Sequence, residues 1–219
     1  AIWAQGVSSA ADGTVIARVG NHELPPFFWQ ENGQWQGVDI AFYRALEREA
    51  GLAFAFERLP WSRAIEYMKT GKCQIMTQLS KTAEREEYMH FLGPYAMEDM
   101  VLVVTKERAK LPIASLNDMV GLAKRADRKI GIEEDAFYSE EFNSRLKNEP
   151  EFAASFSFAK MTLTQMVVHD RLFGCFDRRV VISHLIKTQP EYQGLAIHPF
   201  QIGTGPVYFG VSKKMPEAT

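Results

Sequence analysis

The chain has 219 residues, with 46% apolar residues, 24% charged residues and a formal net charge of −2. This is the composition of an ordinary soluble globular protein, long enough for one domain or two small ones. Its charge balance gives no electrostatic reason to expect a nucleic acid or an anionic membrane as partner, and no apolar run approaches the ~18 residues that span a bilayer.

Short strands alternate with helices along the chain. Strands are expected at 14–19, 52–59, 73–78, 97–105, 129–132, 156–158, 173–176, 195–198 and 207–211. Helices are expected at 39–50, 61–69, 82–87, 116–120, 139–146, 163–171 and 180–187. Asp39 is the expected cap of the first helix and Gly51 its stop. The alternation predicts an α/β protein with open, mostly parallel sheets and helices on both faces.

The first residues have two interpretations. Small residues at Ser8 and Ala10 fit a secretory cleavage site after Ala10, which makes residues 1–12 the remnant of a signal peptide. Alternatively, residues 1–12 are a disordered terminus.

Signals for catalysis, metals and cofactors are weak. Cys73 and Cys175 each lie in an apolar, strand-like run, which predicts buried free thiols, and no Cys-x-x-Cys spacing occurs. The five histidines show no metal-ligand spacing. No Gly-x-Ser-x-Gly, His-Glu-x-x-His or phosphate-loop motif is present. The expectation is a protein that is not an enzyme and has no metal and no cofactor.

Residues 24–106 carry five motifs in a characteristic order. These are Leu24-Pro25-Pro26-Phe27, the Gly-rich turn at 33–40, a helix from Trp61 to Gly71-Lys72, the segment 75–85 ending in Thr82-Ala83-Glu84-Arg85, and Phe91-Leu92-Gly93-Pro94-Tyr95. Together they resemble lobe one of the amino-acid-type solute-binding proteins of ABC importers, the extracellular solute-binding proteins of family 3. The segments 115–121, 129–132, 170–177 and 207–214 resemble later parts of the same family more loosely.

The resemblance implies a two-lobed periplasmic-binding-protein fold of type II. Lobe one would comprise 13–104 and 201–219, and lobe two 105–200, with crossovers near Thr105 and Pro199–Gln201. Ligand would bind in the cleft outside the carboxyl ends of the strands, and hinge closure would follow. The closed form would deliver its solute to a membrane permease outside the cytoplasm, in the periplasm or an equivalent space. The family normally continues with further lobe-one helices beyond Thr219.

Arg85 is the expected anion anchor. A guanidinium grips a carboxylate through a planar fork of donors, and the resemblance assigns the Arg of Thr82-Ala83-Glu84-Arg85 to a ligand carboxylate. The alternative is a surface ion pair with a neighbouring glutamate. Ser80, Thr77 and Gln78, at the end of the preceding strand, are the expected additional donors, with turn capping as their alternative.

Trp61 and Phe27 are the expected apolar walls of the site, since the resemblance places an aromatic residue near each position. Core packing is their alternative role. Arg63 is a candidate second cation, or a surface residue.

Lobe two is expected to close the site. Ala136, Phe137 and Tyr138 would open a helix whose free amides favour anions. Asp177 is the candidate partner of a ligand ammonium, but strict spacing places Arg178 at the family's aspartate position. An inward Arg178 would favour a ligand with a second negative group, or one without an amine.

Two other functions fit the same fold. One is a ligand-sensing module of a receptor. The other is a dehydratase-like enzyme, which would need a carboxylic acid in the cleft, with Glu23, Asp135 and Asp177 as candidates.

Overall fold

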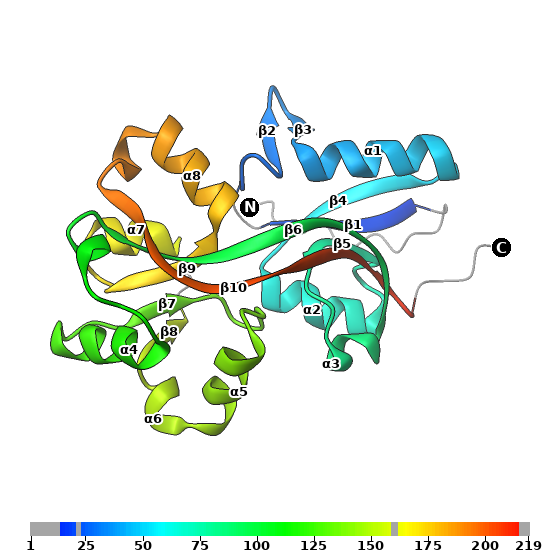
Figure 1. Cartoon of the computed structure of the whole chain (residues 1–219). Coiled ribbons are helices and arrows are strands. Elements are labelled where there is room, and N and C mark those ends of the chain that lie inside the picture. The colour runs from blue at the N-terminus through cyan, green and yellow to red at the C-terminus, as the bar shows by residue number, and fades with distance from the viewer. Residues whose placement is uncertain (1–13, 21–22, 159–161, 215–219) are drawn as a thin grey trace, which may run out of the picture. The chain divides into compact units, whose positions relative to one another are not determined.

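Strands and helices alternate through most of the computed structural model, which describes residues 14–20, 23–158 and 162–214 (Figure 1). The expected signal-peptide remnant, 1–12, lies outside the described residues. The strands are β1 Thr14–Gly20, β2 Trp29–Glu31, β3 Gln34–Gln36, β4 Ala53–Leu59, β5 Ile75–Leu79, β6 Met89–Thr105, β7 Ile130–Ile132, β8 Phe156–Phe158, β9 Gly174–Arg178 and β10 Leu195–Ser212. The α-helices are α1 Val38–Ala50, α2 Trp61–Thr70, α3 Ala83–Glu86, α4 Leu116–Arg125, α5 Glu140–Asn148, α6 Pro150–Ala153, α7 Leu163–Val168 and α8 Arg179–Thr188, and short 3-10 turns lie at Arg108–Lys110 and Pro190–Tyr192.

The chain divides into two compact units. Unit 1 comprises Ala1–Gly93 and Tyr208–Thr219, and unit 2 comprises Pro94–Val207. The family resemblance places the crossovers near Thr105 and Pro199–Gln201. In the structure β6 and β10 are single long strands, so both divisions fall inside them.

The continuity of β6 and β10 corrects the predicted strands 97–105, 195–198 and 207–211. Pro94 lies within β6 and Pro206 within β10. Both prolines are exposed. Because proline lacks an N–H donor, a strand tolerates it where that donor would face solvent.

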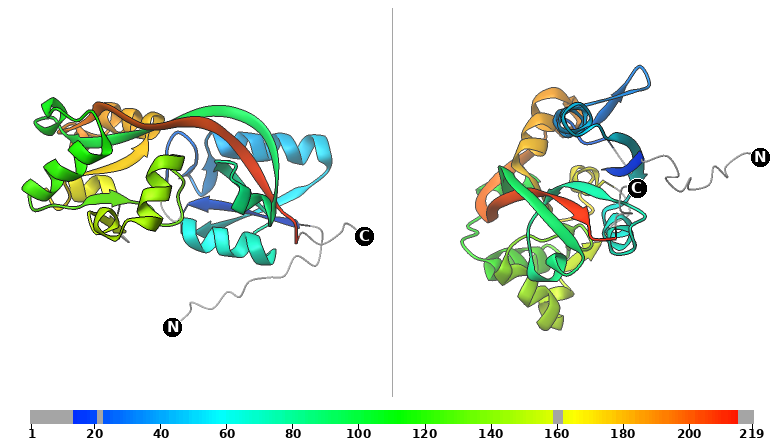
Figure 2. Two further views of the ribbon diagram at one scale, coloured as in Figure 1. Left: turned by 60° about the horizontal axis from the view of Figure 1, so that its bottom comes forward. Right: turned by 90° about the vertical axis from the view of Figure 1, so that its right-hand side faces the viewer.

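Unit 1 is built on four strands in the order β4-β1-β5-β10. β1 runs parallel to β4 and β5, and the end of β10 pairs antiparallel with β5. Successive residues of a strand face opposite sides of a sheet. Accordingly Ile75 packs in the cluster containing Tyr43 of α1, and Met76 in the cluster containing Met68 of α2. Helices α1 and α2 therefore cover opposite faces of this sheet (Figure 2).

In unit 2, too, helices cover both faces of the sheet. β7 runs parallel to β8 and β9, and β9 pairs antiparallel with β6. In β6, Leu102 and Val104 pack with α4 and α5, whereas Val101 and Val103 pack with α7 and α8. This alternation explains the continuous apolar run at 100–104, because a strand covered by helices on both faces has no polar side.

A two-stranded hairpin, β2–β3, stands outside the main sheet of unit 1 (Figure 1). Its loop is Asn32-Gly33, and both residues have positive φ angles, 50° and 76°. Asn-Gly is the preferred sequence for a two-residue loop of this hand. The hairpin leads directly to Gly37 and the first turn of α1.

Candidate functional site

Arg85 lies at the carboxyl end of the parallel strands of unit 1 and is only 6% exposed. It belongs to the short helix α3, whose N-cap Thr82 accepts a hydrogen bond from the Arg85 amide at 3.2 Å. Its Nη1 donates to the carbonyl oxygen of Ser80 at 2.9 Å. Of the neighbouring carboxylates, Glu86 pairs with Lys81 at 2.8 Å. The guanidinium is therefore held inward against the turn that follows β5.

Trp61 joins this arrangement and brings a second arginine with it. Trp61 is the first residue of α2 and is 5% exposed. The Cζ atoms of Arg85 and Arg18 lie 5.8 and 5.0 Å from its ring centroid, within cation–π range. The Nε of Arg18 donates to the Leu59 carbonyl at 3.3 Å. Sequence reasoning missed Arg18, although an arginine inside the apolar strand β1 was a usable signal.

Thr77 and Gln78 direct their side chains at one buried carboxylate. The Oγ1 of Thr77 and the Nε2 of Gln78 both donate to Oδ2 of Asp39, at 2.7 and 2.6 Å. Asp39 was expected to cap α1, and that prediction was wrong. Gly37 is the N-cap, and α1 has no side-chain cap. The Asp39 side chain reaches the end of β5 instead.

The other expected residues of unit 1 differ in burial. Phe27 is half-buried and packs against the core cluster that contains Tyr43, while its neighbour Phe28 is 2% exposed and fully in that cluster. Arg63 lies on an exposed face of α2. The structure therefore brings Arg85, Ser80 and Trp61 together, with Thr77 and Gln78 joined to them through β5. The ligand roles of these five residues, and of Phe27 and Arg63, stay predictions.

In unit 2, β9 ends at Asp177 and Arg178, beside an acidic strand neighbour. The Nε of Arg178 lies 2.8 Å from Oε1 of Glu98 on β6, and both side chains are about 14% exposed or less. The Asp177 carboxylate accepts the Arg178 amide at 2.7 Å. Burial acts to lower the pKa of Arg178, but the carboxylates of Glu98, Glu133 and Asp177 raise it above its ordinary value. Burial raises the pKa of Asp177 to about 6, against the opposing effect of Arg178.

The raised pKa of Asp177 predicts a loss of stability with rising pH. Below about pH 4 the carboxyl is protonated in the folded and unfolded states. Between about pH 4 and 6 the unfolded chain ionises first, so the folded state binds more protons and its free energy of unfolding falls. A shift of about two units corresponds to on the order of 2–3 kcal/mol. Asp177→Asn is expected to remove this component, measured by urea unfolding at pH 4.5 to 7.5.

Asp99→Asn is the matched control for Asp177→Asn. Hydrogen bonds from Thr204 and Arg179 lower the pKa of Asp99, so its stabilisation is lost only as pH falls below about 4. Between pH 4.5 and 7.5 the stability difference between the wild type and Asp99→Asn is therefore expected to stay constant. The prediction is contradicted if the free energies of unfolding of the wild type and Asp177→Asn differ by the same amount at every pH from 4.5 to 7.5.

The segment before α5 differs from expectation. Ala136, Phe137 and Tyr138 were expected to open a helix with free amides, but α5 begins at Glu140 with Ser139 as its N-cap. Asn143 Oδ1 accepts the amides of Tyr138 and Ser139, at 2.8 and 3.2 Å. Those two amides are therefore already satisfied within unit 2. The ligand roles proposed for Ala136 and Phe137 stay predictions.

Two of the carboxyls considered for a catalytic role are solvent-facing. Asp135 is exposed with a φ of 58°. Glu23 is exposed and accepts the Gln30 amide at 3.1 Å. Of the three carboxyls, only Asp177 therefore has the burial that would raise its pKa for acid–base catalysis.

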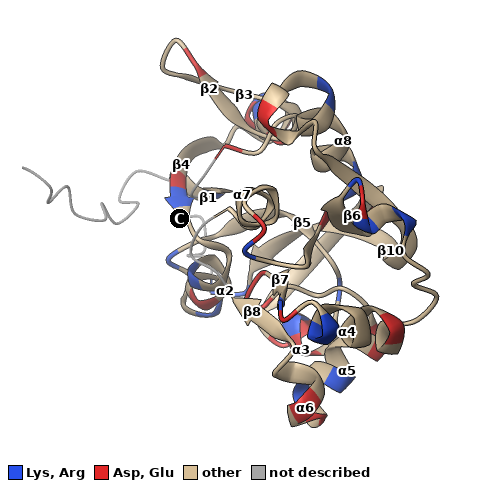
Figure 3. Cartoon of the chain, turned by 90° about the vertical axis from the view of Figure 1, so that its left-hand side faces the viewer, with Lys and Arg blue, Asp and Glu red and all other residues tan. Residues whose placement is uncertain are grey.

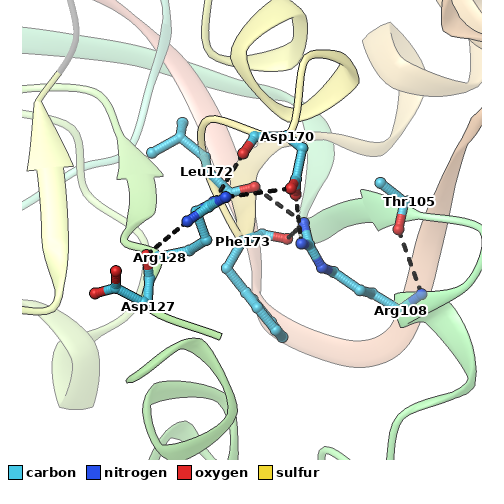
Figure 4. A network of polar contacts seen from close by, with 7 residues as sticks. All are labelled: Thr105, Arg108, Asp127, Arg128, Asp170, Leu172 and Phe173. Carbon is cyan, nitrogen blue, oxygen red and sulfur yellow. Dashed lines mark hydrogen bonds and ion pairs between the residues drawn. The ribbon is translucent and has the colours of Figure 1, made fainter. Parts of the chain in front are cut away.

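A polar network at the amino ends of β7 and β9 ties unit 2 together (Figure 4). Arg108 donates to the carbonyls of Leu172 and Phe173, both at 3.1 Å, and pairs with Asp170 at 2.5 Å. Arg128 binds the same Asp170 through its carbonyl, at 2.8 Å, and its carboxylate, at 3.4 Å. A shallow hollow of about 450 Å³ adjoins this network. These bonds fix the loop before β9 and give it a structural role.

Charge is mixed over the helices of unit 2, where α4 and α5 carry both signs (Figure 3). None of the helices in the described part of the chain has the length and hydropathy of a membrane span. The described residues also contain no cluster of histidine, cysteine or acidic side chains that could hold a metal ion. Cys73 and Cys175 are buried free thiols, and burial raises the pKa of Cys73 to about 12.

The family follows from a comparison with known proteins. The family model for bacterial extracellular solute-binding proteins, family 3, matches residues 17–216, and the chain belongs to this family. A curated relative, the probable amino-acid-binding protein YxeM of Bacillus subtilis (strain 168), is 30% identical over 115 residues. That match covers 52% of this chain and 43% of the relative, so it spans less than half of the relative's length.

Solved structures share the fold at low sequence identity. The arginine-bound form of truncated ArgBP from T. maritima has a TM-score of 0.74 at 16% identity, covering 92% of this chain and 89% of that one. A histidine kinase sensor domain with similarity to periplasmic binding proteins has a TM-score of 0.74 at 17% identity, covering 91% and 82%. The expected family and α/β fold class are thereby confirmed.

Proposed function

We propose that the protein captures an amino acid, or a related solute with a carboxylate group, and delivers it to the permease of an ABC importer outside the cytoplasm. The observation that carries the proposal is the inward Arg85 at the carboxyl end of β5. Parallel α/β sheets bind ligands at this end of their strands. A guanidinium fixed by the Ser80 carbonyl and placed beside Trp61 offers an oriented cation for a carboxylate.

The comparisons support an amino acid as the solute class. The family consists of extracellular solute-binding proteins, and the curated relative is a probable amino-acid-binding protein. ArgBP, which shares the fold, was solved with arginine bound. Arg178, the second cation considered, is already paired with Glu98 at 2.8 Å within unit 2, so the carboxylate proposal rests on Arg85.

The test is isothermal titration calorimetry of the protein with the twenty amino acids, four dicarboxylates and four amines without a carboxylate. We expect one-to-one binding in the micromolar range or tighter for at least one carboxylate, and no binding of the amines. Each bound compound is then incubated with the protein and followed by proton NMR. Unchanged spectra support a binding protein, whereas consumption of the compound identifies an enzyme. Binding of amines alone contradicts the proposal.

A sensing role is the second candidate, because a histidine kinase sensor domain shares the fold over 91% of this chain. Both roles predict the same binding isotherm, so the titration does not separate them. Uptake does: radiolabelled amino acid enters vesicles carrying the permease in the presence of the protein if it serves transport.

A further inference from the structure

Asp39 is a buried carboxylate that contacts the end of β5. It lies in the first turn of α1, is 1% exposed, and accepts hydrogen bonds from both Thr77 and Gln78 on one oxygen. Burying a carboxylate is costly unless strong hydrogen bonds compensate. Bonds to a charged acceptor are about twice as strong as neutral ones, and the amino end of a helix favours negative charge. The Asp39 carboxylate therefore links α1 to β5 through two strong hydrogen bonds.

The same residue is tied at its backbone to the segment that carries Phe27. Its amide donates to the Phe27 carbonyl at 3.0 Å, and the preceding Val38 amide donates to the Pro26 carbonyl at 3.0 Å. A Cβ at Gly37 would lie 2.2 Å from the Phe27 oxygen, and Gly37 has a φ of 119°. Glycine at this position permits the close approach, and Asp39 thus has a fixed location.

Gln78 adopts a backbone conformation that needs such a tie. Its φ is 60°, in the left-handed region that glutamine rarely occupies, and it is 4% exposed. A strained residue of this kind persists only where its surroundings determine it. Two residues later Ser80 offers the carbonyl that holds Arg85. Asp39 accepts a hydrogen bond from the Gln78 side chain, Gln78 lies two residues before Ser80, and the Ser80 carbonyl accepts a hydrogen bond from Arg85.

We propose that Asp39 is a positioning residue for the carboxylate site of Arg85: it holds the strained turn at Gln78 and so fixes where the guanidinium points. This inference rests on the proposed function. Asp39 acts through its hydrogen bond to Gln78, which lies two residues before Ser80.

The experiment is calorimetric titration of the wild type and Asp39→Asn with L-arginine, L-glutamine and L-glutamate. The three probes share an α-carboxylate and differ in side-chain charge. Asparagine keeps the shape of Asp39 but removes the charge that strengthens both hydrogen bonds. We expect the affinity of every probe that binds to fall by the same factor, about tenfold. Asp118→Asn, the same change in the first turn of α4 in unit 2, is the matched control and leaves affinity unchanged.

A double variant with Arg85→Lys separates positioning from general destabilisation. If Asp39 acts through Arg85, the double variant loses less affinity than the product of the two single losses. If the double variant loses affinity by the full product of the two single losses, the proposal is overturned. Wild-type affinity in Asp39→Asn, with a loss in Arg85→Lys, overturns it and leaves the proposed function standing. No binding of any amino acid by the wild type overturns both. If Asp39→Asn does not fold, Thr77→Val removes one of the two bonds, and unchanged affinity there overturns the proposal.

Discussion

Replacing Arg85 by alanine is expected to weaken the binding of a carboxylate-bearing amino acid by about 100-fold or more. A charge-assisted, bidentate contact contributes roughly 3 kcal/mol or more when one partner is truncated, and each 1.4 kcal/mol is a factor of ten in the dissociation constant. Arg85 is only 6% exposed, so the contact would form away from bulk water, where the attraction is least screened. Calorimetry with the amino acid found in the binding screen measures the change.

Arg85→Lys and Arg48→Ala are the companion variants. Lysine keeps the charge but not the planar fork, and it cannot reproduce the donor geometry that holds the Ser80 carbonyl, so an intermediate loss is expected. Arg48 is exposed in the last turn of α1, and its removal makes the same change in net charge without touching the site. If Arg85→Ala and Arg48→Ala bind with equal affinity, Arg85 is not the anchor. Thermal unfolding of each variant confirms that the binding comparison uses folded protein.

Phe142→Ala is expected to cost unit 2 about 4 kcal/mol of stability. Phe142 is fully buried in α5, and its ring lies within about 6 Å of four other aromatic rings. The partners are Tyr138, Phe176, Phe152 and Phe156, with centroid distances of 5.3, 5.1, 5.7 and 4.9 Å. Truncation removes these contacts and leaves a cavity that four bulky rings cannot close. Urea unfolding followed by circular dichroism measures the loss.

Phe158→Ala is the matched control for Phe142→Ala. Phe158 ends β8 in the same unit but is 55% exposed, so its truncation leaves no cavity and is expected to cost under about 0.5 kcal/mol. A Phe142→Ala variant within 1 kcal/mol of the wild type would show that the aromatic cluster does not carry the core of unit 2.

Much of the fold could be predicted from local patterns. The helix starting at Trp61, with its stop at Gly71, and the strand 156–158 were both predicted, because such signals act within a few residues. The full lengths of β6 and β10 could not be placed this way. Whether Pro94 or Pro206 ends a strand depends on which edge of the backbone faces solvent, and neighbouring strands decide that.

The candidate site shows the same division. Arg85, Ser80 and Trp61 were found because they lie in motifs close together in sequence. Arg18 and the role of Asp39 were missed, since each meets its partners through strand pairing and helix packing across about 40 residues. A charged residue in an apolar strand was the available signal for Arg18. For Asp39 a stronger local expectation, helix capping, was the wrong one.

The carboxyl end of β10 bears on the order in which the nascent chain can fold. Ser212 closes unit 1 by donating its amide to the Gln74 carbonyl at 2.9 Å and its hydroxyl to the Met68 carbonyl at 2.6 Å. These residues are synthesised after the whole of unit 2, which is one unbroken stretch. On the ribosome, unit 2 is therefore complete before unit 1, and the edge of β5 lacks its β10 partner until residues 208–212 emerge.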